Sequence, residues 1–347
     1  MCSQDQEVRM KILDKKHLIT VIKNWAERYR VISPVRTSHN ETIFDIFDEN
    51  TFTLDYTKPS MPPKSLYLPQ SETIFTVENG EYTPVTSRIK SLLFGIRACD
   101  MTAILQSKSF MNGEVADLFY NSHSDNTITV VMACAGPQND TCFCTTTKSG
   151  PYAKKGYDLQ FYDVGESFLV AIGSETGTEL SNIEGFSDID DADALNKIQS
   201  FQKEAEQSIE RIPEFTPAMD RLSNGGIRDE FWERFGNKCI VCGGCTFVCP
   251  TCTCFNVADR PTAPGKGDRL RTWDACLYGG FTKEASGHNP RSSQGIRLKR
   301  RHEHKLLYYT DRDTHGGLCT CVGCGRCSDY CPVHIGTIEV VKAIAGE

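Results

Sequence analysis

Residues 239–250 read CIVCGGCTFVCP, and residues 321–332 repeat the same cysteine phrase as CVGCGRCSDYCP. In each phrase three cysteines are separated by two residues, a fourth follows after three more, and a proline comes next. Thiolates at this spacing curl around one 4Fe-4S cluster, and the proline fixes φ at the bend that follows. The repeated phrase therefore predicts iron–sulfur clusters and makes electron transfer the first hypothesis for this chain.

The same spacing is typical of two-cluster bacterial ferredoxins, in which the fourth cysteine of each phrase binds the other cluster. We therefore expect two interlocked sets of four ligands. The first cluster would be held by Cys239, Cys242, Cys245 and Cys331, and the second by Cys321, Cys324, Cys327 and Cys249. Small residues let backbone amides approach a cluster, and this is one role for Gly243, Gly244, Gly323 and Gly325, the other being simple turns.

Zinc and disulfides are the alternatives to iron–sulfur clusters. One zinc ion needs four thiolates, whereas these phrases offer eight, and zinc gives no reason for the trailing Cys-Pro in both copies. The 17 cysteines are an odd number, which speaks against complete disulfide pairing. Residues 1–7 are polar and acidic and do not read as a secretory segment. We therefore expect a reducing cytoplasmic location, where many cysteines usually indicate metal binding.

Composition limits the classes of partner. The chain has 347 residues, of which 39% are hydrophobic and 24% charged, so most of it should fold. No stretch approaches the roughly 20 apolar residues that a membrane-spanning helix needs. The formal net charge of −7 argues against a nucleic-acid partner.

We expect an α+β protein in which a mixed α/β N-terminal domain precedes a mostly helical ferredoxin-like domain with two 4Fe-4S clusters. The expected boundaries are 1–185 for the first domain, 186–230 for an acidic and helical linker, and 231–347 for the dicluster domain. The insert at 251–320 separates the two phrases far more widely than in a minimal ferredoxin, so it should wrap the clusters or present them to a partner. Periodicity predicts helices at 17–29, 101–107, 194–211 and 338–344, strands at 92–96 and 128–132, and a hairpin at 158–173.

Four further cysteines follow predicted strands of the first domain. Cys99 follows the strand at 92–96, Cys134 follows the one at 128–132, and Cys142 and Cys144 lie in the next loop. Loops that leave neighbouring strands could bring these four soft ligands together, which predicts a third iron–sulfur cluster or a zinc site. The alternative is a set of buried free thiols that pack as small hydrophobic side chains. The carboxylate of Asp100, beside Cys99, is a candidate oxygen ligand or supporting group.

Five cysteines remain. Cys252, Cys254 and Cys276 lack an obvious fourth partner, so we expect them to pack around the clusters rather than to bind metal. Cys319 could complete that set or lie beside Cys321, and Cys2 is expected to be a terminal thiol.

Basic and imidazole side chains follow the insert. The stretch 291–305 contains six cations, which would either dock a partner and compensate cluster charge or form a solvated helix. His288, His302 and His304 are expected to be surface or hydrogen-bonding residues rather than ligands.

Several longer motifs carry a family resemblance. They are CPTCTC at 249–254, WDAC at 273–276, GHNPR at 287–291, CVGCGRC at 321–327, LFGIRACD at 93–100, CFC at 142–144, and TLDYT at 53–57 with PPK at 62–64. Through them the chain resembles, over almost its whole length, the iron–sulfur beta subunit of sulfhydrogenase and the similar A subunit of anaerobic sulfite reductase. Ser286 and Cys319 depart from the family pattern, which leaves the role of the loop at 276–291 open.

The resemblance implies an electron relay inside a larger complex. A flavin subunit would take electrons from NAD(P)H, and this chain would pass them to a terminal reductase, which could be a sulfite reductase, a hydrogenase or sulfur reductase, or a heterodisulfide-type enzyme. The sequence contains no Gly-x-Gly-x-x-Gly after a strand and no P-loop, so we expect no flavin or nicotinamide on this chain itself. The alternatives are a zinc-stabilised scaffold protein and a stand-alone thiol-based reductase.

Overall fold

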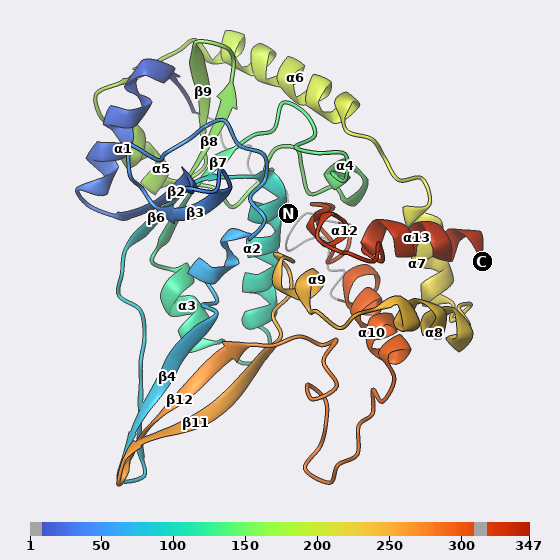
Figure 1. Ribbon diagram of the computed structural model, residues 1–347. Coiled ribbons are helices and arrows are strands. Elements are labelled where there is room, and N and C mark those ends of the chain that lie inside the picture. Colours follow the sequence, from blue (N-terminus) through green and yellow to red (C-terminus); the bar gives the residue numbers. More distant parts are fainter. Residues whose placement is uncertain (1–8, 309–317) are drawn as a thin grey trace.

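The computed structural model describes residues 9–308 and 318–347, which exclude Cys2. Within these ranges the chain is a mixed α/β protein with an eight-stranded sheet, a four-stranded sheet and a group of helices near the C-terminus (Figure 1). The expectation of a mixed α/β N-terminal region is confirmed.

The larger sheet has the strand order β10-β1-β9-β8-β7-β6-β2-β3. Its centre, from β2 through β6 and β7 to β8, is parallel, and its flanks are antiparallel. All six residues of β6 are buried, as expected for a parallel strand covered on both faces. The strands are β1 (Met10–Asp14), β2 (Arg30–Arg36), β3 (Thr42–Ile46), β6 (Ser91–Ile96), β7 (Thr127–Met132), β8 (Leu159–Asp163), β9 (Ser167–Ile172) and β10 (Phe186–Asp188).

Alternate residues of the central strands face two helical layers, because side chains of a strand point to opposite faces in turn. Phe94 of β6 packs in the same core as α1 (Leu18–Ala26) and α5 (Glu175–Ser181). Its neighbour Leu93 packs with α2 (Ala98–Met111) on the other face, and Ile96 lies there too because an irregularity between Phe94 and Ile96 interrupts the alternation. On that same face Leu169 of β9 packs with α6 (Asp191–Ser208). The result is a three-layer α/β/α arrangement.

The smaller sheet joins distant parts of the sequence. Strands β4 (Ser71–Glu78) and β5 (Glu81–Pro84) belong to the N-terminal half, whereas β11 (Phe255–Ala263) and β12 (Lys266–Trp273) come from the insert between the two cysteine phrases. All of its pairings are antiparallel, and β12 pairs with β4. Figure 1 shows this long ribbon extending away from the rest of the molecule. The insert therefore binds the dicluster segment to the N-terminal half, which the sequence did not reveal.

The C-terminal segment is built from short helices around its own core. Helix α8 packs against α10, and α13 packs against α7, with aromatic residues such as Trp232 between them. Figure 1 shows these helices grouped together on one side of the larger sheet. Their bounds are α7 (Phe215–Ser223), α8 (Asp229–Lys238), α9 (Gly244–Phe247), α10 (Gln294–Leu306), α12 (Arg326–Asp329) and α13 (Thr337–Gly346). The remaining short helices are η1 (Lys15–His17), η2 (Pro63–Leu66), α3 (Leu118–Ser124) and α4 (Cys144–Thr147).

Most predicted elements are present with shifted ends. The helices expected at 17–29, 101–107 and 338–344 correspond to α1, α2 and α13, and the hairpin at 158–173 is β8–β9. The helix expected at 194–211 starts earlier because the carboxylate of Asp190 accepts hydrogen bonds from the backbone N–H groups of Ala192 and Asp193. The acidic stretch therefore includes a helix cap. Strand β10, just before it, pairs with β1 at the edge of the larger sheet.

None of the described helices is long and apolar enough to span a membrane.

Candidate functional site

The two cysteine phrases fold in the same way. The residue before the second cysteine is left-handed in both, with φ of 60° at Val241 and 58° at Gly323. The residue after that cysteine is also left-handed, with φ of 73° at both Gly243 and Gly325, and each of these glycines caps a four-residue helix, α9 or α12. Positive φ is costly for a branched side chain such as that of Val241. The matching conformations support the inference from spacing that both phrases have the same task.

Four thiols of the predicted second cluster lie around one cavity. This second thiol set consists of Cys249, Cys321, Cys324 and Cys327, all of which line the same cavity. Three of the cysteines come from the second phrase and one from the end of the first, as the ferredoxin pattern requires. Burial raises the pKa of Cys321, and it raises the pKa of Cys324 to about 11, so each thiol needs a positive neighbour or a metal to ionise.

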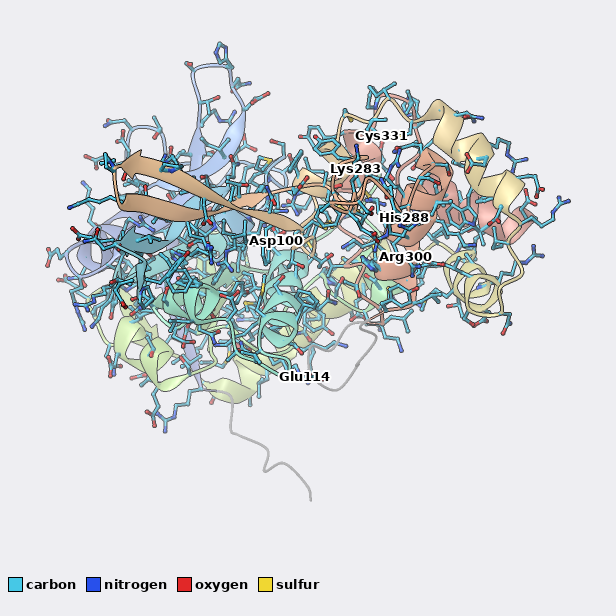
Figure 2. All side chains as sticks on the ribbon, turned by 90° about the horizontal axis from the view of Figure 1, so that it is seen from below. Asp100, Glu114, Lys283, His288, Arg300 and Cys331 are labelled. Atoms are coloured by element: carbon cyan, nitrogen blue, oxygen red, sulfur yellow. The ribbon has the colours of Figure 1, made fainter. Side chains whose placement is uncertain are left out.

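The first thiol set consists of Cys239, Cys242, Cys245 and Cys331, and it lies nearer the surface. Burial raises the pKa of Cys245, and the charges of Cys327, Cys239 and Cys331 add to this effect, so these sulfurs are electrostatic neighbours. Gln294 donates a hydrogen bond to the sulfur of Cys239 over 3.3 Å, and the backbone N–H of Ile335 donates one to the sulfur of Cys331 over 3.3 Å. Cys242 is exposed. Figure 2 places Cys331 in the helical C-terminal part of the molecule.

The third thiol set consists of Cys99, Cys134, Cys142 and Cys144, and these four residues also line one cavity. Cys99 lies at the start of α2, Cys134 follows β7, Cys142 lies in the next loop, and Cys144 is the first residue of α4. The structure therefore brings together the cysteines that the strand positions predicted to meet. Burial raises the pKa of Cys99, Cys134 and Cys144.

Cys324 connects the second and third thiol sets, because it lines both cavities. The loops that carry the two sets touch directly. The backbone N–H of Phe143 donates to the carbonyl of Gly323 over 2.9 Å, and a Cβ at Gly323 would lie 2.6 Å from the carbonyl oxygen of Phe143. Glycine is therefore required here for the close approach of the two loops.

Buried cations surround the thiol sets. Arg97 lines the cavity of the third set, and its charge partly offsets the rise that burial causes in the pKa of Cys134. Lys58 contacts Cys142 over 3.7 Å and donates to the carbonyl of Cys324. Arg301 and Lys305 line the second cavity, and both side chains are almost fully buried, at 1% and 4% exposed.

The charge on these cations is stabilised by sulfur. Burial alone would lower the pKa of Lys305, but the nearby thiolates of Cys249 and Cys252 more than offset it, and the pKa is raised. Burying a cation is costly unless an anion accompanies it. The arrangement therefore suits centres that carry net negative charge, as thiolate-bound iron–sulfur clusters do.

Of the two roles expected for the basic stretch 291–305, charge compensation applies to some residues and solvent exposure to others. Arg301 and Lys305 compensate thiol charge, whereas Lys299 lies at the surface and pairs with Asp229 over 3.3 Å. His302 is fully buried, contacts the carbonyl of Leu298 over 2.9 Å, and has a pKa lowered to about 3 by burial.

His288, which is labelled in Figure 2, is exposed and lies 3.3 Å from Glu284 in the loop between β12 and α10. Asp100 binds Arg326, whose two nitrogens lie 2.6 and 3.0 Å from its carboxylate oxygens. The Asp100 carboxylate, a candidate oxygen ligand or supporting group in the sequence analysis, is therefore paired with Arg326.

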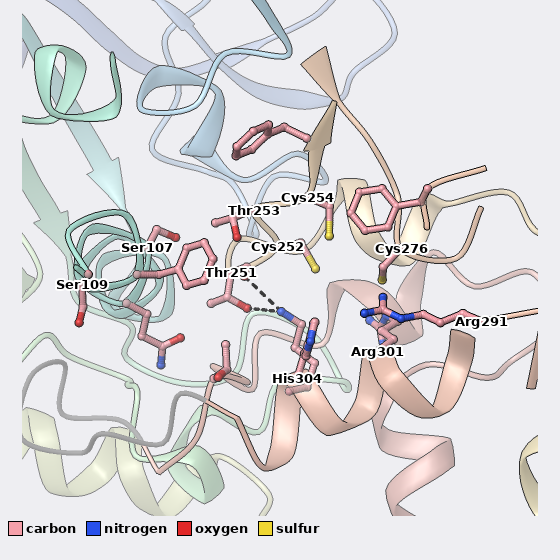
Figure 3. A pocket seen from close by; sticks show the side chains of 17 residues that line it. Ser107, Ser109, Thr251, Cys252, Thr253, Cys254, Cys276, Arg291, Arg301 and His304 are labelled. Atoms are coloured by element: carbon pink, nitrogen blue, oxygen red, sulfur yellow. Dashed lines mark hydrogen bonds between the residues drawn. The ribbon is translucent and has the colours of Figure 1, made fainter. Parts of the chain in front are cut away.

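A larger cavity of about 560 Å³ adjoins the second thiol set. Cys252, Cys254 and Cys276 line it, together with Arg291 and three aromatic rings, those of Phe110, Phe255 and Phe281 (Figure 3). We call it the dithiol cavity. Local sequence patterns do not reveal this cavity, because Cys254 and Cys276 are brought together only by the β11–β12 hairpin between them. Cys319 is not among its lining residues and lies beside Cys321, to whose carbonyl its thiol donates over 3.6 Å.

Among the described residues, no group of three His, Cys, Asp or Glu side chains is arranged to hold a single metal ion. The thiol sets around the cavities nevertheless fit iron–sulfur clusters in ligand chemistry. Each offers four soft thiol donors and buried cations, while Gly323 keeps two of the cluster loops in contact.

Comparison with known proteins assigns the class. The family described as "4Fe-4S dicluster domain" matches residues 238–335, so this segment is similar to proteins that bind two 4Fe-4S clusters. It is also 29% identical, over 322 residues, to sulfhydrogenase 2 subunit beta of Pyrococcus furiosus, with 91% of this chain and 92% of the relative covered. Together these matches confirm the predicted resemblance to the iron–sulfur beta-subunit family. No solved structure matches this chain.

Proposed function

We propose that this chain relays electrons through iron–sulfur clusters between a flavin subunit that uses NAD(P)H and a terminal reductase. The similarity to a subunit of a sulfhydrogenase supports a role within a multi-subunit enzyme. The clusters would supply the chemistry, which is reversible storage of one electron at a time. The chain itself would hold them, set their charge environment and keep them in fixed relation.

The observation that carries the proposal is the direct connection between thiol sets. Cys324 lines the cavities of both the second and the third set, and Cys327 of the second set is an electrostatic neighbour of Cys245 in the first. A series of sites in contact is what an electron relay needs, whereas a protein that uses metal only to stabilise its fold has no need of adjoining sites. We propose 4Fe-4S clusters on the first and second sets and a third iron–sulfur cluster on the third set.

Partner contact is best supported at the first thiol set. Cys242 is exposed, and its neighbour Ile240 is 60% exposed. An exposed apolar residue beside a redox centre suits a surface that is covered when another subunit docks. The proposal also includes a reducing cytoplasmic compartment, since the described cysteines are all free thiols. It assigns no flavin or nicotinamide to this chain.

Metal analysis of the full chain, purified without oxygen, tests the proposal against the zinc scaffold. Three clusters predict about twelve irons with equal acid-labile sulfide, and two clusters predict about eight, at four irons per cluster. Stoichiometric zinc without sulfide would establish the scaffold instead.

A second experiment separates the relay from a stand-alone reductase. The isolated chain should accept electrons from a reduced flavin donor but should not reduce sulfite, polysulfide or protons at a physiological rate. Turnover of any of these substrates by the isolated chain would contradict the relay.

A further inference from the structure

The dithiol cavity contains a pair of thiols that the relay does not use. Cys254 precedes β11 and Cys276 follows β12, and Phe255 pairs with Trp273 at the base of this hairpin. The backbone N–H of Asp274 donates to the carbonyl of Cys254 over 3.0 Å, which continues the pairing toward Cys276. Cys254 and Cys276 both line the dithiol cavity, and each shifts the pKa of the other, so their sulfurs are close neighbours. The hairpin thus places two sulfurs side by side at a cavity wall.

The same cavity shares a wall with the second thiol set. Thr251, Arg301 and Lys305 line both cavities. Lys305 donates to the hydroxyl of Thr251 over 2.8 Å, as Figure 3 marks, and that hydroxyl lies 3.3 Å from the sulfur of Cys249. One residue therefore separates the dithiol cavity from a proposed cluster ligand.

The lining also indicates what kind of molecule the cavity would accept. Its volume of about 560 Å³ lies in the range of small-molecule sites. The aromatic rings of Phe110, Phe255 and Phe281 suit an organic body. Arg291 and Arg301 supply positive charge, and each has a buried nitrogen, Nη1 and Nε respectively, without a hydrogen-bond partner among the described residues. Buried donors without partners favour an anionic ligand that would accept their hydrogen bonds.

We propose that Cys254 and Cys276 form a redox-active dithiol that reduces a small organic disulfide bearing an anionic group. This inference rests on the proposed function, because the relay would supply the electrons that reduce the dithiol. It adds a terminal reduction site to a chain otherwise assigned only to relay.

The chemistry balances as two thiol exchanges and one reduction. The thiolate of Cys254 attacks the bound disulfide, so that the ligand S–S bond breaks, a mixed disulfide forms and the first thiol leaves. Cys276 gives its proton to that leaving thiolate and attacks the sulfur of Cys254, which releases the second ligand sulfur. The Cys254–Cys276 disulfide then accepts two electrons, supplied one at a time by reduced iron–sulfur centres. With two protons from water, one ligand disulfide becomes two thiols.

The ionisation of the pair agrees with these roles. The neighbouring thiol of Cys276 lowers the pKa of Cys254 to about 7, and the nearby sulfur of Cys254 raises the pKa of Cys276. A thiol with a pKa near the ambient pH is the best attacking nucleophile, so Cys254 attacks and Cys276 resolves.

The first test maps disulfides and does not depend on cluster activity. The full chain is treated with oxidised glutathione, which is an anionic organic disulfide, then alkylated, digested and analysed by mass spectrometry. A Cys254–Cys276 bond is expected in the wild type, and a stable mixed disulfide with glutathione on Cys254 is expected in Cys276→Ser. Absence of both products overturns the dithiol, whether or not the chain holds iron.

The second test uses chain whose clusters have been reduced and freed of excess reductant. Oxidised glutathione should reoxidise them with release of two thiols per two electrons. Cys254→Ser and Cys276→Ser should slow this by more than about tenfold while iron content stays at the wild-type level. Cys319→Ser, another buried cysteine, is the control and should react at the wild-type rate. Wild-type rates in Cys254→Ser would overturn the inference, whereas a chain without iron would fail the proposed function instead.

The anionic group is tested with Arg291→Gln. Its KM for oxidised glutathione should rise about tenfold, since a charged hydrogen bond is lost, while its KM for the neutral disulfide of 2-mercaptoethanol stays unchanged. An equal effect on both substrates would rule out recognition of charge by Arg291.

Discussion

Arg326 of the second cysteine phrase donates two hydrogen bonds to Asp100 of α2, over 2.6 and 3.0 Å. The two residues are 226 positions apart in the sequence, and their side chains are 0% and 1% exposed. Asp100 follows Cys99 directly, and Arg326 precedes Cys327. This ion pair therefore fixes the third thiol set against the second one, and Arg326 also binds the carbonyl of Pro59 over 2.8 Å.

Asp100→Asn should destabilise the fold strongly. It would leave the Arg326 guanidinium buried without a counter-charge, which costs about 3–5 kcal/mol in the free energy of unfolding. Denaturant titration measures the loss. Asp125→Asn is the control, because the Asp125 carboxylate forms an exposed pair with Lys108 over 3.0 Å and its removal should cost less than about 1 kcal/mol. Equal losses in both variants would mean that the buried pair has no special structural role.

Gly325→Ala should lower iron content as well as stability. Gly325 has φ of 73°, and a Cβ there would collide with the backbone of Thr141 in the loop of the third thiol set. Gly287→Ala is a matched control, since Gly287 has φ of 85° but nothing within 4 Å of the added carbon, so strain of about 1 kcal/mol is its whole expected cost. Iron analysis of both variants checks this. Full iron in Gly325→Ala would show that close contact of the two loops is not needed.

Replacing Cys142 and Cys144 together by serine should remove one cluster, or about four irons per chain, and leave the C-terminal segment folded. The two residues line one cavity with Cys99 and Cys134. Of the second thiol set, only Cys324 also lines this cavity. Iron content and circular dichroism give the measurement. Unchanged iron would retire the third cluster.

Lys305→Met should make the potential of a cluster on the second thiol set more negative, on the order of 100 mV for the loss of one nearby buried unit charge at an effective dielectric constant near 20. The cation favours the reduced cluster, which carries one more negative charge, so its loss disfavours reduction. Lys299→Met on the same helix removes a surface cation instead and should shift the potential far less. A redox titration followed by paramagnetic resonance measures both. A more positive potential in Lys305→Met would contradict the assignment.

The buried imidazole of His302 should make stability depend on pH. Its folded pKa is lowered to about 3 from 6.5, so between these values the unfolded chain binds more protons. Stability is therefore full above about pH 6.5 and falls as the pH drops toward 3. Between pH 6.5 and 5, the denaturant midpoint of unfolding should fall less in His302→Gln than in the wild type. The exposed control His288→Gln should follow the wild type. Equal acid sensitivity in all three proteins would contradict a buried neutral His302.

The sequence predicted well whatever depends on local spacing or periodicity. The cysteine phrases, the strand at 92–96 and the hairpin at 158–173 are all local patterns, and Cys99 and Cys134 could be placed at one sheet edge because each follows a predicted strand. Pairings across long sequence separations were not accessible. The pairing of β12 with β4, the ion pair of Asp100 with Arg326, and the approach of Cys254 to Cys276 depend on tertiary folding that no local signal reveals. The dithiol cavity was missed for this reason.

The most direct test of the account is paramagnetic resonance of the full chain, purified without oxygen and reduced. Because the thiol sets adjoin through Cys324, we expect signals of reduced 4Fe-4S clusters that are broadened by magnetic coupling and that simplify in the Cys142→Ser, Cys144→Ser variant. A colourless sample without any signal on reduction would contradict it.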